Sequence, residues 1–144
     1  MVINTNIVGT GTITIPLDHP ASGGLLEING RVGHGETINV DAGVLQLDQP
    51  LRFLGHINFN ASVDPFESVL LQGIRADSYS YNGSVLSLFQ GREDIEDIKI
   101  ALGQNALPFH VSQAGGAVLV SAIDPSFLHM AWAPNVPFGF LQFL

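Results

Sequence analysis

The chain contains no cysteine and very few cationic side chains. The absence of cysteine excludes disulfide bonds, a thiol nucleophile and thiolate-bound zinc. Five Lys and Arg residues stand against 13 Asp and Glu residues, so the net charge is −8. Binding to nucleic acid depends on clustered cations that neutralise phosphates. We therefore expect no nucleic-acid partner, and an anionic membrane surface would repel the chain.

Long apolar runs are also missing. No run approaches the ~20 residues that a helix needs to cross a bilayer, so we expect no membrane insertion. The segment from Met1 to Asn6 has no basic stretch followed by an apolar core, and we do not expect it to be a signal peptide. Helical patterning is confined to residues 92–102. That segment also alternates, and its β-branched isoleucines favour a strand.

Short strands bounded by turn residues occupy most of the chain. Apolar or alternating pieces are separated by Gly, Asn, Asp or Pro, which is typical of paired or stacked β-strands. The sequence therefore predicts an all-β protein of about ten short strands. The best examples are Thr12–Ile15, Leu25–Ile28, Thr37–Val40, Val44–Leu47 and His56–Phe59.

The pairing of these strands is open to two interpretations. A right-handed parallel β-solenoid in the first half is the first choice. A two-sheet antiparallel β-sandwich is the alternative, because Asn82-Gly83 and Gly115-Gly116 are hairpin signals and solenoids use few hairpins. Residues 63–102 have the pattern of a β-meander, with a type I′ turn centred on Asn82 and Gly83.

Two regions differ in composition. Residues 1–125 form the predicted single β domain, and residues 126–144 are an apolar tail that we expect to pack on this domain or on a neighbouring subunit. The aromatic side chains of the tail either fill such an interface or stack on sugar rings. They are the candidate interaction surface, namely Phe127, Trp132, Phe138, Phe140 and Phe143.

No motif points to a catalytic, cofactor or metal site. The five histidines have no zinc-ligand spacing, and the Asp18-His19 and Asp64/Glu67 pairs lie beside prolines in turn-like context. The densest acidic cluster is Glu93–Asp97. It is interpreted either as a calcium site, because calcium prefers several oxygen ligands, or as a solvated edge that discourages strand-to-strand aggregation. We therefore expect no enzyme and no cofactor.

The order of the strands resembles a known pattern. A Gly-x-Thr strand precedes a Gly-x-Leu-x-Leu strand, then an aromatic strand with Gly-x-Ile, and then a Tyr-x-Gly hairpin. These elements are similar to the repeat modules of bacterial autotransporter-passenger and adhesin-like proteins. The resemblance implies export to the cell surface or medium, a β-solenoid-like or β-sandwich fold, and a structural or adhesive role. The segments that carry it are 35–40, 43–47, 53–59, 67–74 and 77–89.

The balance of side chains favours self-association. Apolar residues make up 46% of the chain and charged residues only 12%. Such a composition fits a surface covered by Thr, Ser, Asn and Gln, or one covered in part by another subunit. We therefore expect a secreted or cell-surface bacterial homo-oligomer that is a structural or adhesive module. The alternative function is a carbohydrate-binding module with a glycan partner.

Overall fold

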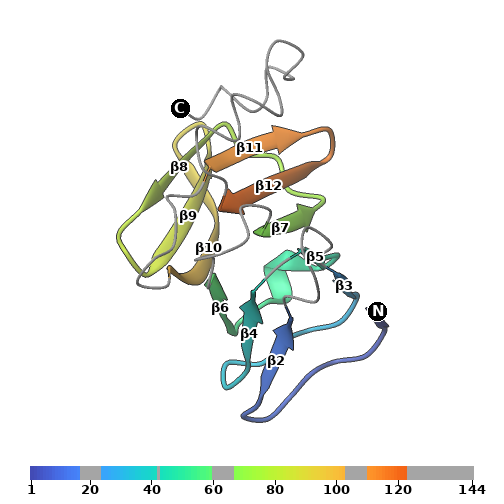
Figure 1. The fold of residues 1–144 in the computed structure, drawn as a ribbon. Helices are drawn as coiled ribbons and strands as arrows, with labels where there is room; N and C mark the ends of the chain where they lie inside the picture. Colours follow the sequence, from blue (N-terminus) through green and yellow to red (C-terminus); the bar gives the residue numbers. More distant parts are fainter. Residues whose placement is uncertain (17–23, 42, 60–66, 103–109, 123–144) are drawn as a thin grey trace.

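The computed structural model describes residues 1–16, 24–41, 43–59, 67–102 and 110–122. Within these residues the protein is all-β, apart from one short 3-10 helix, and its strands form two mixed six-stranded sheets (Figure 1). The first sheet has the order β1-β3-β5-β7-β12-β11, and the second has the order β2-β4-β6-β10-β9-β8. The elements are β1 (Val2–Ile3), β2 (Thr12–Ile15), β3 (Leu25–Ile28), β4 (Thr37–Val40), β5 (Val44–Leu47), η1 (Pro50–Arg52), β6 (His56–Phe59), β7 (Glu67–Gln72), β8 (Ser78–Tyr81), β9 (Val85–Gln90), β10 (Glu93–Leu102), β11 (His110–Ala114) and β12 (Ala117–Ala122).

Parallel pairing dominates the first half of the chain. Consecutive strands alternate between the sheets, so β1, β3, β5 and β7 are parallel neighbours in one sheet, and β2, β4, β6 and β10 are parallel neighbours in the other. Between the sheets, single parallel bridges join Ile7 to Val32 and Val32 to Phe53. Each successive pair of strands in this half therefore adds one strand to each sheet, with a bridge residue between the two strands. Figure 1 shows β2, β4 and β6 side by side.

Antiparallel hairpins extend both sheets in the second half. The second sheet continues from β10 through β9 to β8, and the first sheet continues from β7 through β12 to β11. The predicted meander over residues 63–102 is therefore correct only for β8–β10. Strand β7 belongs to the other sheet, because its apolar residues pair with β5 in parallel register.

The predicted strands are confirmed, and one turn needs correction. All five strands named above have the predicted bounds, and residues 93–102 form a strand. The hairpin between β8 and β9 exists, but the backbone amide of Asn82 donates to the carbonyl of Val85, which centres the turn on Gly83 and Ser84. Gly83 has a φ of +100°, and the Asn82 side chain accepts hydrogen bonds from Ser84 and Val85. Asparagine suits position 82 because its side chain accepts hydrogen bonds from the turn, and not because residue 82 is a central residue of the turn.

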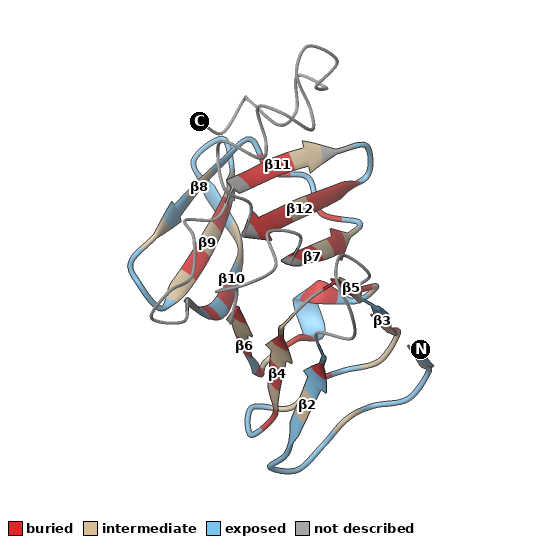
Figure 2. Cartoon of the chain, in the orientation of Figure 1, coloured by how far each residue is buried: buried red, intermediate tan, exposed pale blue. Residues whose placement is uncertain are grey.

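One hydrophobic core contains inward side chains of both sheets. Strands β4, β5 and β6 have alternating buried and more exposed residues, as expected when one face of a strand is covered (Figure 2). Phe59, Ile57, Leu88 and Ile28 are fully buried in this cluster. Among the residues that the structure describes, no helix is long and apolar enough to cross a membrane.

Candidate functional site

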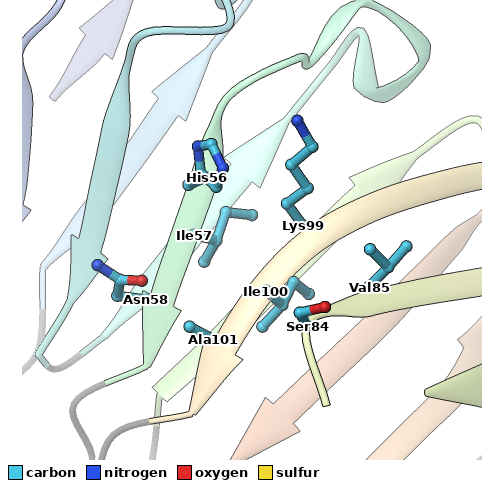
Figure 3. A pocket seen from close by; sticks show the side chains of 8 residues that line it. All are labelled: His56, Ile57, Asn58, Ser84, Val85, Lys99, Ile100 and Ala101. Carbon is cyan, nitrogen blue, oxygen red and sulfur yellow. The ribbon is translucent and has the colours of Figure 1, made fainter. Parts of the chain in front are cut away.

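A hollow of about 250 Å³ opens on the outer face of the second sheet (Figure 3). Residues of β6 and β10 form it because these strands are parallel neighbours, with His56 opposite Lys99 and Asn58 opposite Ala101. Alternate residues of a strand share a face, so these four side chains lie outside the sheet, while Ile57 and Ile100 are buried beneath it. We call this hollow the outer groove; it is lined by His56, Ile57, Asn58, Ser84, Val85, Lys99, Ile100 and Ala101.

A ladder of polar side chains leads into the outer groove and ends there. The Asn39 amide donates to Thr14 Oγ1 at 3.4 Å, and the Asn58 amide donates to Asn39 Oδ1 at 3.0 Å. The next position in the register is Ala101, whose methyl group cannot continue the ladder. The Asn58 side-chain nitrogen faces Asn39, so the side-chain oxygen of the same residue, Asn58 Oδ1, lies on the side of Ala101 (Figure 3).

The opposite wall of the outer groove comes from the turn between β8 and β9. Ser84 is exposed, and its hydroxyl donates to Asn82 Oδ1 at 3.2 Å. The carbonyl oxygen of Ser84 accepts the amide of Ile100 at 3.0 Å, which attaches this turn to β10. Hydrogen bonds therefore attach Ser84 both to Asn82 within its own turn and to Ile100 on β10. Val85 adds an apolar surface beside Lys99.

Lys99 gives the outer groove a positive charge. It is the only lysine of the chain, and it is exposed. Within the described part of the chain, no carboxylate forms an ion pair with it. The groove thus offers one ammonium group, one imidazole, one hydroxyl group and one amide oxygen. This set can bind a polar ligand, but the described groove contains no pair of carboxylates that could carry out acid–base catalysis on a glycoside.

A second, more open hollow of about 670 Å³ lies near the turns at the ends of β7, β9 and β12. It combines Arg75 with the acidic residues Glu93 and Asp94, and it includes Leu51, of which 65% is exposed. Its charges are of mixed sign. The outer groove, in contrast, has a single cationic side chain and an ordered series of hydrogen-bonding side chains leading into it.

The acidic cluster Glu93–Asp97 lies along β10. The register shifts between Asp94 and Glu96, which is a β-bulge, and Glu96 is opposite the fully buried Leu88. Glu96 therefore lies on the inward side, whereas Glu93, Asp94 and Asp97 are exposed. Among the residues described here, no three His, Cys, Asp or Glu side chains gather as a metal site. The acidic residues of β10 pair with β9, and β6 pairs only with residues 99–102, so among the described strands this segment has the free side that the solvated-edge interpretation requires.

The inward position of Glu96 gives a prediction for the pH dependence of stability. Burial, together with the charges of Asp97 and Asp94, raises the pKa of Glu96 from 4.5 to about 7. Between these values the folded protein holds a proton that the unfolded chain has released, so the free energy of unfolding falls as the pH rises from about 4.5 to about 7. We expect Glu96→Gln to melt at a higher temperature than the natural protein at pH 8, with a smaller difference at pH 5.

The matched control is Glu93→Gln, which neutralises an exposed carboxylate on the same strand. It should leave the pH dependence of the melting temperature almost unchanged, because the charge of Glu93 is not among those that raise the pKa of Glu96. Equal pH profiles for the two variants would contradict the assignment to Glu96.

Most residues that the sequence singled out fall outside the described residues. These are the tail aromatics Phe127, Trp132, Phe138, Phe140 and Phe143, together with Asp18, His19 and Asp64. His56 is described and lines the outer groove, although its sequence context gave no reason to choose it. Sequence patterns place His56 and Asn58 on one face of a strand, and Lys99 and Ala101 on one face of another. They do not show that these strands are neighbours.

Comparison of the chain with protein-family models, with curated proteins and with solved structures finds no match. The functional assignment therefore depends on the residues and the geometry described above.

Proposed function

We propose that this protein is a non-enzymatic structural or adhesive module that associates with copies of itself, secreted by a bacterium or displayed on its surface. The observation that carries self-association is the outer edge of the first coil, residues 1–16. Strands β1 and β2 are the terminal strands of the two sheets. Among the described residues, no strand pairs with the free side of either one.

The first coil lacks the features that usually prevent edge pairing. Natural edge strands are commonly protected by charged side chains. Residues 1–16 contain no Asp, Glu, Lys, Arg or His. The coil exposes apolar side chains as well, with Met1 77%, Val2 53% and Val8 73% accessible. In a chain of net charge −8, an edge without charged side chains is where two copies can approach with least repulsion.

The parallel part of the fold fits this role. We propose that the stacked coils are a right-handed β-solenoid, with the antiparallel hairpins forming a sandwich-like end; a two-sheet sandwich throughout is the alternative. In a solenoid, equivalent positions of successive repeats lie directly above one another. Two features of this chain have that arrangement, namely the parallel bridges Ile7–Val32–Phe53 and the side-chain ladder Thr14–Asn39–Asn58. Packing of residues 126–144 on this domain or on a neighbouring copy stays a prediction.

Sedimentation analysis of the mass in solution tests self-association. The natural protein is expected to form a dimer or larger species, and the double variant Thr12→Lys/Thr14→Lys should be monomeric, because two ammonium groups would then lie along β2. Both threonines are exposed. The added positive charge lowers the net repulsion between copies, so loss of association in this variant must come from the edge itself.

The matched control is Ser78→Lys/Ser80→Lys, which places the same charges on exposed positions of β8, the opposite edge of the same sheet. It should keep the natural mass. A second arm deletes residues 126–144. If only the deletion produces monomers, the tail and not the first coil joins the copies. A natural protein that stays monomeric at high concentration would refute self-association.

The second candidate function is a carbohydrate-binding module, and the outer groove favours it. The groove combines hydrogen-bonding groups with small apolar surfaces on the outer face of the sheet. Carbohydrate binding would be refuted if neither neutral nor acidic oligosaccharides change the melting temperature of the protein.

A further inference from the structure

We propose that the outer groove binds a saccharide that carries a carboxylate, with the Lys99 ammonium group facing the carboxylate and Asn58 Oδ1 accepting a sugar hydroxyl. This inference rests on the carbohydrate-binding candidate and narrows it to acidic sugars. It depends on two features of the groove, namely the end of the polar ladder at Ala101 and the positive charge of Lys99, which has no carboxylate partner among the described residues.

The end of the ladder determines what kind of group the ligand must present. Each asparagine of the ladder donates its amide hydrogen to the side chain before it. At Asn58 the acceptor oxygen faces Ala101, whose side chain has no hydrogen-bond donor (Figure 3). A group that fills this position must therefore donate a hydrogen bond, and a sugar hydroxyl can do so. The Ser84 hydroxyl on the opposite wall can accept a second one.

Lys99 determines the sign of the ligand's charge. Within the described residues its ammonium group has no carboxylate partner, although the chain carries 13 acidic residues. Hydrogen bonds between charged groups are stronger than those between neutral ones. Figure 3 shows the Lys99 side chain extending from β10 beside His56, with its ammonium group directed away from Ala101 and Asn58. Lys99 is opposite His56, two residues along β10 from the Asn58–Ala101 pair, so the ligand would present its carboxylate and its hydroxyl group at separate positions of the outer groove.

The size and surroundings of the groove favour a sugar over a polyanion such as nucleic acid. At about 250 Å³ the groove is smaller than the pockets of about 300–1,000 Å³ that enclose drug-sized ligands, so it fits one sugar ring of a longer chain. A single lysine in a chain of net charge −8 cannot neutralise a run of phosphates. It can pair with one carboxylate, and neighbouring rings would then lie along the polar outer face formed by Thr37 and Asn39.

Calorimetric titration with tri-galacturonate and with neutral galactotriose tests the inference. The natural protein should bind the acidic trisaccharide at least tenfold more tightly than the neutral one. Lys99→Gln should weaken binding of tri-galacturonate about tenfold or more, the scale of one charge-assisted hydrogen bond, and should leave the neutral sugar unaffected. Lys99→Arg should retain most of the affinity. The matched control is Arg92→Gln, which removes an exposed cation from the turn between β9 and β10.

A second variant tests the ladder without removing any existing contact. In Ala101→Asn the new amide can donate to Asn58 Oδ1 and its side chain fills the groove. This variant should bind neither sugar, while its melting temperature stays equal to that of the natural protein or rises. An unchanged affinity in Ala101→Asn would show that the ligand does not use this position and would overturn the inference.

The remaining outcomes separate the inference from the function on which it rests. Equal affinity for both sugars, lost in Ala101→Asn but not in Lys99→Gln, would overturn the acidic-sugar inference and support carbohydrate binding. Equal weakening by Arg92→Gln and Lys99→Gln would show general electrostatic attraction and overturn the inference. If neither sugar binds at millimolar concentration, both the inference and the carbohydrate-binding candidate fail.

Discussion

Replacing Gly30 with alanine is expected to lower the free energy of unfolding by about 3 kcal/mol, the upper end of the usual cost of overpacking. A methyl group at this position would overlap with the carbonyl group of Thr5 and would lie 2.9 Å from the amide nitrogen of Asn6. These are backbone atoms of the first coil, so no side-chain rotation can relieve the clash. The first coil would have to move away from the segment around Gly30 that follows it in the stack.

That movement would break the hydrogen bonds that attach the first coil. The amide of Ile7 donates to the carbonyl of Arg31 at 2.8 Å, and the amide of Arg31 donates to Asn6 Oδ1 at 2.9 Å. Denaturant unfolding measures the total decrease in the free energy of unfolding. Hydrogen exchange shows whether the amides of the first coil lose protection before the other amides of the domain.

The matched control for this prediction is Gly24→Ala. A methyl group there meets no atom within 4 Å, and the φ of Gly24 is not in the left-handed region. We expect a change within about 0.5 kcal/mol, as for most surface substitutions. Similar unfolding curves for Gly30→Ala and the natural protein would mean that the backbone at Gly30 does not approach the first coil as described.

Replacing Phe59 with alanine is expected to lower the free energy of unfolding by about 3–5 kcal/mol, the range for buried phenylalanine. Phe59 has the largest side chain among the fully buried residues that the structure describes. It lies on β6, between Val40 of β4 and Leu102 of β10 in the register of the second sheet. Its loss would leave a cavity where the parallel strands meet the antiparallel hairpins. Urea denaturation followed by circular dichroism measures the effect.

Phe89→Ala provides the comparison, because Phe89 lies on β9 of the same sheet but is only half-buried. Its removal should cost about 1 kcal/mol, since less apolar surface is lost from the folded state. If the two variants unfolded at the same urea concentration, Phe59 would not occupy the core position that the structure assigns to it.

The strands themselves could be predicted from the sequence because their cause is local. Alternation of apolar and polar residues, as in Thr37–Val40 and His56–Phe59, produces one buried and one more exposed face in any sheet. The two-residue turn at Gly115-Gly116 and the hairpin after Tyr81 were also readable, because glycine tolerates positive φ. The position of the turn at Asn82 was wrong by one residue, since turn dipeptides do not specify which backbone groups pair.

The candidate site could not be predicted in this way. His56 and Lys99 are neighbours only because β10 follows two other strands of its sheet and then returns beside β6. Nothing in the local pattern of either strand identifies the partner, and the intervening strand β7 joins the opposite sheet. The end of the ladder at Ala101 is visible only once Asn58 and Ala101 are known to be opposite each other.

By itself the sequence determined the all-β class, the bounds of many strands, the acidic charge and the uncharged first coil, because each of these depends on residue type and short-range alternation. Only the tertiary structure decided which strands pair, where parallel stacking changes to antiparallel hairpins, and which side chains meet in the outer groove. Those outcomes depend on contacts between residues far apart in the chain. A strand with alternating residues can form backbone hydrogen bonds with any of several other strands. Only the packing of the shared core selects one arrangement.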